Sequence, residues 1–253
     1  MPSRVPPPGF VSFEAGAASV VCAANIEGDV RQMLTAGTLY DYARHHPAAR
    51  SLTGRRVVYA VPLPTSVERV VIRRNHHGGL VGDFRSDLFL PPTRAPRELS
   101  TSERLRVAGV PTPAMLGYAV YRAGPGLRRA DIMTLEVPHA VDLSTPLKSA
   151  YAPERVRALT AAACLIRALS EIGARHHDLN VKNVLLERLE DLVPRALVLD
   201  VDRVTFARKG APVLEQNLAR LLRSARKWQT THGARVTDAE LDDFAALVRA
   251  GPN

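Results

Sequence analysis

The sequence predicts an α+β fold with a β-rich N-terminal lobe and a reduced, mainly helical C-terminal lobe. Up to about residue 137, β-branched and aromatic runs lie between turn-forming glycines and prolines, as in strands joined by loops. From Pro153 onwards, apolar residues recur at helical spacing instead. This change of period predicts two lobes, residues 1–137 and 138–253, which together form one domain with a short link near 137–142.

The first lobe is expected to contain several strands and two helices. Strands are predicted where β-branched and aromatic residues cluster, at 57–61, 69–73, 115–122 and 131–137. One helix is predicted at 29–44. A second is predicted at 96–108, because Gly109 and Pro111 follow it as stop signals. The lobe is therefore expected to be rich in strands, with the helix at 96–108 between them.

The second lobe is expected to begin with a long helix. Pro153 and Glu154 are favourable in a first helical turn, and Gly173 ends the apolar helical pattern. Two short strands are expected after it, at 183–186 and 196–199. Two helices are expected to follow, one from about Val213 and one from Asp238. The two short strands therefore follow directly on the end of the long helix.

Composition limits the classes of function. The chain has 253 residues with 34 Lys and Arg against 25 Asp and Glu, a net charge of +9 that favours anionic partners. Only 5% of residues are aromatic, so stacking platforms for nucleic acid are not expected. The proline-rich start lacks the apolar core of a signal peptide, and no apolar run is long enough to span a bilayer. We therefore expect a cytoplasmic chain that can contact a membrane surface.

The two cysteines are too few for a disulfide framework. Cys164 lies within an otherwise apolar run of alanines, leucine and isoleucine. We therefore expect a buried structural thiol at this position.

The strongest functional signal is a loop that contains a carboxylate able to bind a hydroxyl and an amide able to bind a magnesium ion. The segment His176-His177-Asp178-Leu179-Asn180-Val181-Lys182-Asn183 follows a helix stop and precedes a strand, and the next strand leads to Asp200. Phosphoryl transfer needs a carboxylate for the acceptor hydroxyl and oxygen ligands for the cation on the phosphates. An Asp followed five residues later by an Asn, with a further Asp after the paired strand, supplies these groups. The pattern predicts ATP- and Mg²⁺-dependent phosphotransfer, with Asp178, Asn183 and Asp200 facing one cleft.

A structural interpretation of the same residues competes with this one. Asp and Asn are common turn formers, and a histidine–aspartate pair is usually structural. The placement after a helix and before two short strands favours the kinase-type site. His176 is expected to brace the loop by hydrogen bonding rather than to act as a base.

These segments resemble the lipopolysaccharide kinases, in particular the 3-deoxy-D-manno-octulosonic acid (Kdo) kinase group and the related core heptose kinases. The resemblance runs from about Leu52 to Lys227. Its anchors are the segments 71–80, 93–99, 109–113, 130–136, 177–180 and 216–224. The Asp loop occurs in many kinases, whereas 71–80 and 216–224 are narrower signals. The resemblance implies a protein-kinase-like fold of two lobes.

The resemblance also implies roles for individual residues. Asp178 becomes the catalytic base or hydroxyl-orienting group, and Asn183 and Asp200 become Mg²⁺ ligands. The nucleotide-binding positions that it implies in the first lobe and the link are Gly54, Arg73, Glu98, Glu136 and Val137.

Positions 73 and 202 depart from the usual kinase pattern. Arg73 replaces the strand lysine, although its guanidinium can bind phosphate bidentately and pair with Glu98. Arg74 is the alternative phosphate contact. Asp202 replaces the usual glycine two residues after the metal-binding Asp, and either joins the metal site or pairs with Arg203.

The acceptor implied by the resemblance is an anionic sugar–lipid, first of all Kdo attached to lipid A, with a core heptose as the alternative. A protein kinase is disfavoured by the short segment after Asp202, and a non-catalytic nucleotide-binding protein by the retained Asp178, Asn183 and Asp200. The helix 216–228 carries several arginines and a lysine. We expect a solvated basic face there, or a contact with the acceptor or an anionic membrane.

Overall fold

Buried hydrophobic side chains form separate cores in two units of the chain. The computed structural model describes residues 5–52, 57–75, 87–188, 194–208 and 212–250. Unit 1 comprises Met1–Glu103 and Ala114–Glu136, and unit 2 comprises Arg104–Pro113 and Val137–Asn253. The segment Arg104–Pro113 thus groups with the later part of the chain. The predicted lobes 1–137 and 138–253 stay a prediction.

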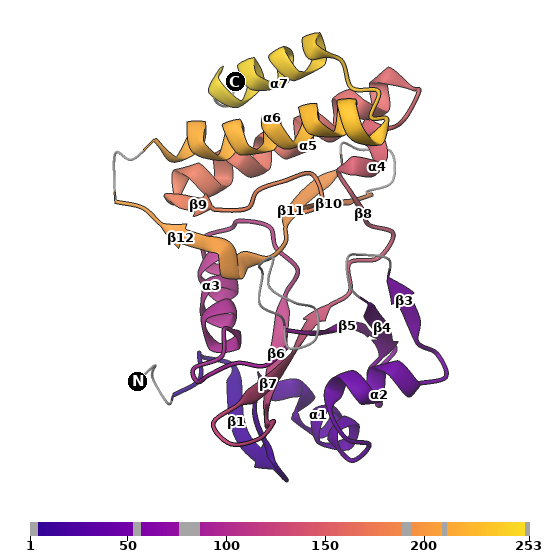
Figure 1. Ribbon diagram of the computed structural model, residues 1–253, viewed down its shortest axis with the longest axis vertical. Helices are drawn as coiled ribbons and strands as arrows, with labels where there is room; N and C mark the ends of the chain where they lie inside the picture. The colour runs from indigo at the N-terminus through magenta and orange to yellow at the C-terminus, as the bar shows by residue number, and fades with distance from the viewer. Residues whose placement is uncertain (1–4, 53–56, 76–86, 189–193, 209–211, 251–253) are drawn as a thin grey trace. The chain divides into compact units, whose positions relative to one another are not determined.

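Unit 1 is built on an antiparallel sheet (Figure 1). Within the described residues this sheet has seven strands in the order β1-β2-β6-β7-β5-β4-β3. Their bounds are Phe10–Ala15 (β1), Ala18–Ala23 (β2), Arg50–Leu52 (β3), Val58–Pro62 (β4), Arg69–Arg74 (β5), Met115–Arg122 (β6) and Arg128–Leu135 (β7). The four strands predicted in this part of the chain are confirmed as β4 to β7, with shifts of up to three residues at their ends.

Helices pack on both faces of this sheet. They are α1 (Glu27–Leu34), α2 (Leu39–His45) and α3 (Ala95–Val107). Ile72 of β5 is buried in one cluster with Met33 of α1 and Leu39 of α2. Ile132 of β7 belongs to the opposite face, because its neighbour in sequence pairs with Ile72, and it is buried with Leu99 of α3. The predicted helix 96–108 is confirmed as α3.

The helix predicted at 29–44 is wrong, because the chain forms two helices there. Gly37 lies between them with a φ of 118°, in the region that favours glycine. The hydroxyl of Thr38 then caps α2 by accepting a hydrogen bond from the Asp41 amide at 3.0 Å. Leu34 and Leu39 both pack in the same core cluster, so the apolar pattern continues across the break and hides it.

The hairpin of β1 and β2 is missing from the prediction. Gly16, with a φ of 58°, forms its turn, and Ala18, Val20 and Cys22 alternate inward along β2. That alternation is the signal for a strand in the sequence. The pattern is short and follows a proline-rich start, so it gives a weak signal.

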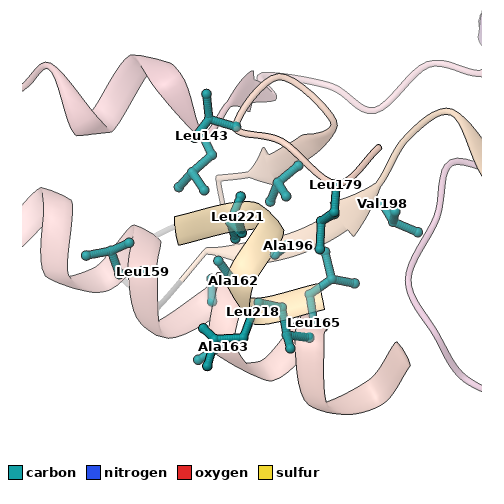
Figure 2. Close-up of a cluster of buried hydrophobic side chains, with 14 of the residues drawn as sticks. Leu143, Leu159, Ala162, Ala163, Leu165, Leu179, Ala196, Val198, Leu218 and Leu221 are labelled. Atoms are coloured by element: carbon teal, nitrogen blue, oxygen red, sulfur yellow. The ribbon is translucent and has the colours of Figure 1, made fainter. Parts of the chain in front are cut away.

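Unit 2 is mainly helical, as predicted. Its helices are α4 (Ser144–Leu147), α5 (Ala152–Glu171), α6 (Val213–His232) and α7 (Asp238–Ala250), and its short strands are β8 (Val141–Asp142), β9 (Ala174–His176), β10 (Val184–Glu187), β11 (Arg195–Val198) and β12 (Val204–Phe206). Figure 2 shows Leu218 and Leu221 of α6 among Ala162 and Leu165 of α5, with Leu179 from the loop after β9. No helix in the described ranges is long and apolar enough to cross a membrane.

The expectation of a buried thiol at Cys164 is wrong. Cys164 is exposed on α5, although its neighbours Ala163 and Leu165 are buried. A helix advances about 100° per residue, so one position in an apolar run can face solvent while those around it face the core. The buried thiol is that of Cys22, and burial raises its pKa to about 11.

A largely buried ion pair joins α7 to α5. The Arg155 guanidinium donates to both carboxylate oxygens of Glu240, and their side chains are only 8% and 14% exposed. Glu240 also accepts from the Thr237 amide, while the Thr237 hydroxyl accepts from the Glu240 amide, which makes a capping box at the start of α7. One carboxylate therefore satisfies a buried arginine and a helix end.

We predict that Glu240→Ala lowers the free energy of unfolding by about 2–4 kcal/mol, because it leaves Arg155 uncompensated and removes half of the capping box. The measurement is urea unfolding followed by circular dichroism. The matched control is Glu215→Ala, which breaks the exposed pair with Arg249. Equal effects of the two substitutions would contradict the stabilising role assigned to the pair of Arg155 and Glu240.

Candidate active site

The loop that carries Asp178 and Asn183 lies between β9 and β10 in unit 2. The Asn183 side-chain amide donates a hydrogen bond to the Asp178 carbonyl oxygen at 2.8 Å, which closes the loop on itself. Asn183 is buried, whereas Asp178 is exposed. The loop therefore has a fixed backbone and presents its carboxylate to solvent, where a substrate hydroxyl can approach.

The strand β11 brings Asp200 to this loop. It pairs antiparallel with β10, and just beyond it the Leu199 amide donates to the Asn183 carbonyl oxygen at 3.0 Å. Asp200 follows with φ 52° and ψ 49°, a left-handed conformation that Asp and Asn adopt more readily than most residues. The backbones of residues 178, 183 and 200 thus meet in one neighbourhood of unit 2.

His176 fixes the start of the loop. Its Nε2 lies 2.9 Å from the Leu199 carbonyl oxygen, and its Nδ1 accepts from the Asp178 amide at 3.1 Å. These two contacts require a proton on Nε2 and none on Nδ1. Burial lowers the pKa of this imidazole, which keeps it neutral. The predicted bracing role of His176 is confirmed, and His177 lies beside it with Nε2 2.6 Å from the Thr205 hydroxyl.

Side chains of helix α6 form hydrogen bonds with the backbone of this loop and of β9. The fully buried Asn217 accepts from the His176 amide at 3.0 Å and donates to the Ala174 carbonyl oxygen at 2.9 Å. Two turns later, the Ser224 hydroxyl accepts from the Val181 amide at 3.1 Å. Neither Asn217 nor Ser224 has a predicted role. The available signal was a pair of polar residues seven apart on the apolar side of this helix.

The donor atoms near Asp200 fit a hard cation. The Asn183 amide nitrogen is engaged with Asp178, so its side-chain oxygen is the atom that it can offer a metal. Asp200 adds a carboxylate, and amide and carboxylate oxygens suit Mg²⁺. Among the described residues, no three His, Cys, Asp or Glu side chains form a metal-binding group. Two protein ligands are nevertheless usual for Mg²⁺, which keeps waters and substrate oxygens as the rest of its shell.

Asp202 lies two residues beyond Asp200, in a short 3₁₀ segment. Its Oδ2 is 3.9 Å from Nε of Arg203, so the pairing considered for it is present as a long contact.

In unit 1, Arg73 of β5 forms an ion pair with Glu98 of α3. The Glu98 side chain is almost fully buried, and that of Arg73 is 26% exposed. The two residues therefore contact each other as expected from the sequence, and the strand residue keeps a partly exposed cationic group.

Arg74 belongs to the opposite face of the sheet, because successive strand residues alternate. Its guanidinium lies over the Tyr40 ring, 4.5 Å from the centroid, and within 3.9 Å of three carboxylates. These carboxylates are Asp41, Asp87 and Asp131. The alternation thus separates Arg74 from Glu98, and leaves Arg73 as the arginine beside α3.

Glu136 marks the end of unit 1. Its amide donates to the Arg69 carbonyl oxygen at 2.9 Å, and its largely buried carboxylate pairs with both Arg50 and Arg69. The side chain therefore ties the sheet together, and only the backbone of Glu136 and of the following Val137 stays a candidate for adenine. Gly54, the predicted residue of the nucleotide-covering loop, lies outside the described residues.

Comparison with known proteins identifies the family. The model of the lipopolysaccharide kinase (Kdo/WaaP) family matches residues 43–246. The chain belongs to this family.

Relatives support the assignment over most of their length. A 3-deoxy-D-manno-octulosonic acid kinase of Actinobacillus succinogenes is 32% identical over 173 residues, which are 67% of this chain and 70% of the relative. The Vibrio vulnificus protein of the same name is 29% identical over 204 residues, or 78% and 80% of the two chains. The solved structure of WaaP in complex with acyl carrier protein aligns with a TM-score of 0.51 at 19% identity, covering 81% of this chain and 80% of that one. This last likeness concerns the fold alone.

As a lipopolysaccharide kinase of the Kdo/WaaP family, the protein is an ATP-using phosphotransferase that acts on a sugar hydroxyl. Its protein-kinase-like fold, with a β-rich N-terminal and a helical C-terminal part, is confirmed. The contacts of Arg73 with Glu98, and of Asn183 with the Asp178 backbone, are present in the structure. The catalytic, nucleotide and metal roles stay predictions.

The carboxyl of Asp131 supplies a pH-dependent contribution to stability. Burial raises its pKa to about 6, although the Tyr40 amide and Arg74 oppose the shift. Because the folded-state pKa lies above the unfolded one, the stabilising contribution is present at low pH and is lost as pH rises through about 6.

We predict that Asp131→Asn flattens the pH dependence of the free energy of unfolding between about pH 4 and pH 7. Denaturant unfolding of both proteins across this range is the measurement. Asp243→Asn, on an exposed position of α7, is the control and should leave the wild-type slope. An unchanged slope in Asp131→Asn would mean that this carboxyl does not titrate as stated.

Proposed function

We propose that the protein phosphorylates a hydroxyl of Kdo attached to lipid A, using ATP and Mg²⁺ at the cytoplasmic face of the inner membrane. The support for Kdo is the name shared by relatives that cover two thirds or more of this chain. The observation that carries the reaction type is the junction of Asp178, Asn183 and the Leu199–Asp200 backbone in one hydrogen-bonded loop pair.

In this proposal Asp178 orients the acceptor hydroxyl and takes its proton. Its carboxylate is exposed, and its backbone is held at the amide by His176 and at the carbonyl by Asn183. The loop therefore loses little backbone entropy when the acceptor binds, because the backbone that carries the carboxylate is already held. Positioning and charge stabilisation are the main contributions that a protein makes to phosphoryl transfer.

Asn183 and Asp200 hold Mg²⁺ through oxygen atoms in this proposal. The cation, when bound, offsets negative charge on the phosphates. The left-handed backbone at Asp200 directs its carboxylate, and Asn at this position would keep the conformation but lose the charge.

The proposed nucleotide contacts lie in unit 1 and at its end. Arg73, oriented by Glu98, binds phosphate oxygens with its planar guanidinium. The Glu136 carbonyl oxygen and the Val137 amide bind adenine, since the Glu136 amide is engaged with Arg69. Gly54 belongs to the segment proposed to cover the nucleotide.

We predict that Asp178→Asn lowers kcat by about 10²- to 10⁴-fold, because the amide cannot accept the proton, while ATP affinity stays near wild type. The assay measures transfer from labelled ATP to Kdo–lipid A. Asn180→Ala is the control for local disturbance, because it changes a side chain of the same loop and keeps the Asp178 carboxylate. Turnover close to wild type in Asp178→Asn would overturn the assigned role.

The same assay separates the acceptor classes. Kdo–lipid A, heptosylated core and a generic protein are offered in parallel. Transfer to the core alone would replace the Kdo proposal by a heptose kinase. Transfer to protein alone would change the substrate class, and nucleotide binding without transfer to any acceptor would indicate a regulatory protein.

A peripheral contact with anionic membrane is proposed for the exposed basic side chains of α6. At about 100° per residue, Arg226 points away from the side of the helix that carries Asn217 and Ser224, and Arg223 lies at the flank. Both are exposed, and Arg226 forms only a loose pair with Asp242 at 3.8 Å. Side chains turned away from the catalytic loop suit a surface outside the reaction site, and acidic lipid headgroups complement their charge.

We predict that the double substitution Arg223→Glu and Arg226→Glu weakens binding to vesicles with acidic phospholipids by about tenfold or more, at about 1 kcal/mol per basic residue. Co-sedimentation at low and high salt is the measurement. Arg157→Glu, on the exposed side of α5, is compared with Arg223→Glu alone as the control for a single charge reversal elsewhere. Binding that is insensitive to the double substitution would remove this contact.

A further inference from the structure

Two lysines and the tryptophan of α6 meet beside the catalytic loop, and the function described above uses none of them. Lys182, which directly precedes Asn183, places its ammonium group 5.2 Å from the centroid of the Trp228 ring. Lys148, which follows α4, places its ammonium group 5.0 Å from the same centroid. His232 stacks on the indole with a centroid distance of 4.3 Å and an interplanar angle of 18°. Two cations therefore share one aromatic ring.

The charge of this cluster is only half compensated among the described residues. The Asp142 carboxylate accepts from Lys182 at 2.9 Å through one oxygen, and from the Ser144 amide and hydroxyl through the other. No carboxylate of the described ranges pairs with Lys148. Two ammonium groups held near one ring repel each other, and the single carboxylate is already shared with Ser144. An anion placed between them would relieve that repulsion.

The position of the cluster connects it with the acceptor. Lys182 belongs to the same short loop as Asp178, and the Val181 amide beside it is held by Ser224 of α6. Trp228 follows Ser224 by four residues, so both lie on the side of α6 that faces the loop. We therefore expect a sugar whose hydroxyl lies at Asp178 to come within reach of the lysines of this cluster.

We propose that Lys148, Lys182 and Trp228 form a recognition site for an anionic oxygen group, a carboxylate or a phosphate, of the sugar acceptor. This assignment rests on the proposed function. The two ammonium groups bind the anion, and the indole ring holds both lysine side chains in place through cation–π contacts. Lys148 acts on binding of the acceptor alone in this proposal, because it follows α4 and lies outside the loop that carries Asp178 and Asn183.

Trp228 is the one tryptophan of the sequence, so its fluorescence reports on this site directly. The full chain is titrated with free Kdo, with inorganic phosphate and with glucose as an uncharged sugar, without ATP. We expect a saturable change of emission with Kdo or phosphate and none with glucose. A response to Kdo alone assigns the site to a carboxylate, and a response to phosphate alone assigns it to a phosphate of the acceptor.

Lys148→Gln should raise the Kd of the responding anion and the acceptor KM by about fivefold or more, the effect of losing one charge contact, with the KM for ATP unchanged. Lys148→Arg should restore both values. Arg157→Gln, which removes one exposed positive charge from α5, is the matched control and should change neither. A purely structural cation–π contact predicts that Lys148→Gln leaves both values at wild type.

Failure of this site is distinguishable from failure of the proposed function. If the protein transfers phosphate to Kdo–lipid A, and Lys148→Gln keeps the wild-type anion Kd and acceptor KM, the site is overturned and the proposed function stands. Anion-dependent fluorescence that is weakened in Lys148→Gln, in a chain that transfers no phosphate to Kdo–lipid A, would support the site and reject the function. Equal responses to anions and glucose, or no response, would overturn the site.

Discussion

The arrangement of the loop that carries Asp178 and Asn183 depends on one buried side chain, the amide of Asn217. The strand β9 before the loop has β12 on one side, and the Asn217 amide satisfies a donor and an acceptor of its backbone. A buried amide that makes both hydrogen bonds is favourable, whereas losing it would leave unsatisfied backbone groups in the core. His176 then transmits this position to the Asp178 amide and to Leu199. The backbones at Asp178 and Leu199 are thus held from the same point of α6.

In unit 1 the alternation of strand residues has an equally large effect. Arg73 and Arg74 are neighbours in sequence with the same charge, yet one pairs with Glu98 and the other is enclosed by carboxylates on the α2 face. A shift of one residue in the register of β5 would exchange them. The pairing of Arg73 with Ile132 and of Arg74 with Asp131 fixes that register. The identity of the arginine beside α3 is therefore a property of sheet geometry.

The sequence predicts elements and motifs whose determinants are local. The long helix after Pro153, the strand at 115–122 and the loop around Asp178 all carry their signals within a few residues. The break at Gly37 and the exposure of Cys164 were missed, because an apolar pattern does not show which residues leave the core. Asn217, Ser224 and the Lys148–Trp228 contact were missed because their partners lie far away in sequence. Such contacts require the packing of α6 against the loop, which no local pattern reports.

The most direct test of this account is the kcat of Asn217→Ala at saturating ATP and Kdo–lipid A, with the thermal midpoint recorded on the same sample. If Asn217 positions the loop, kcat falls by about tenfold or more although the thermal midpoint shows that the protein is still folded. Wild-type kcat in a folded Asn217→Ala protein would contradict the central claim that α6 sets the geometry of the catalytic loop.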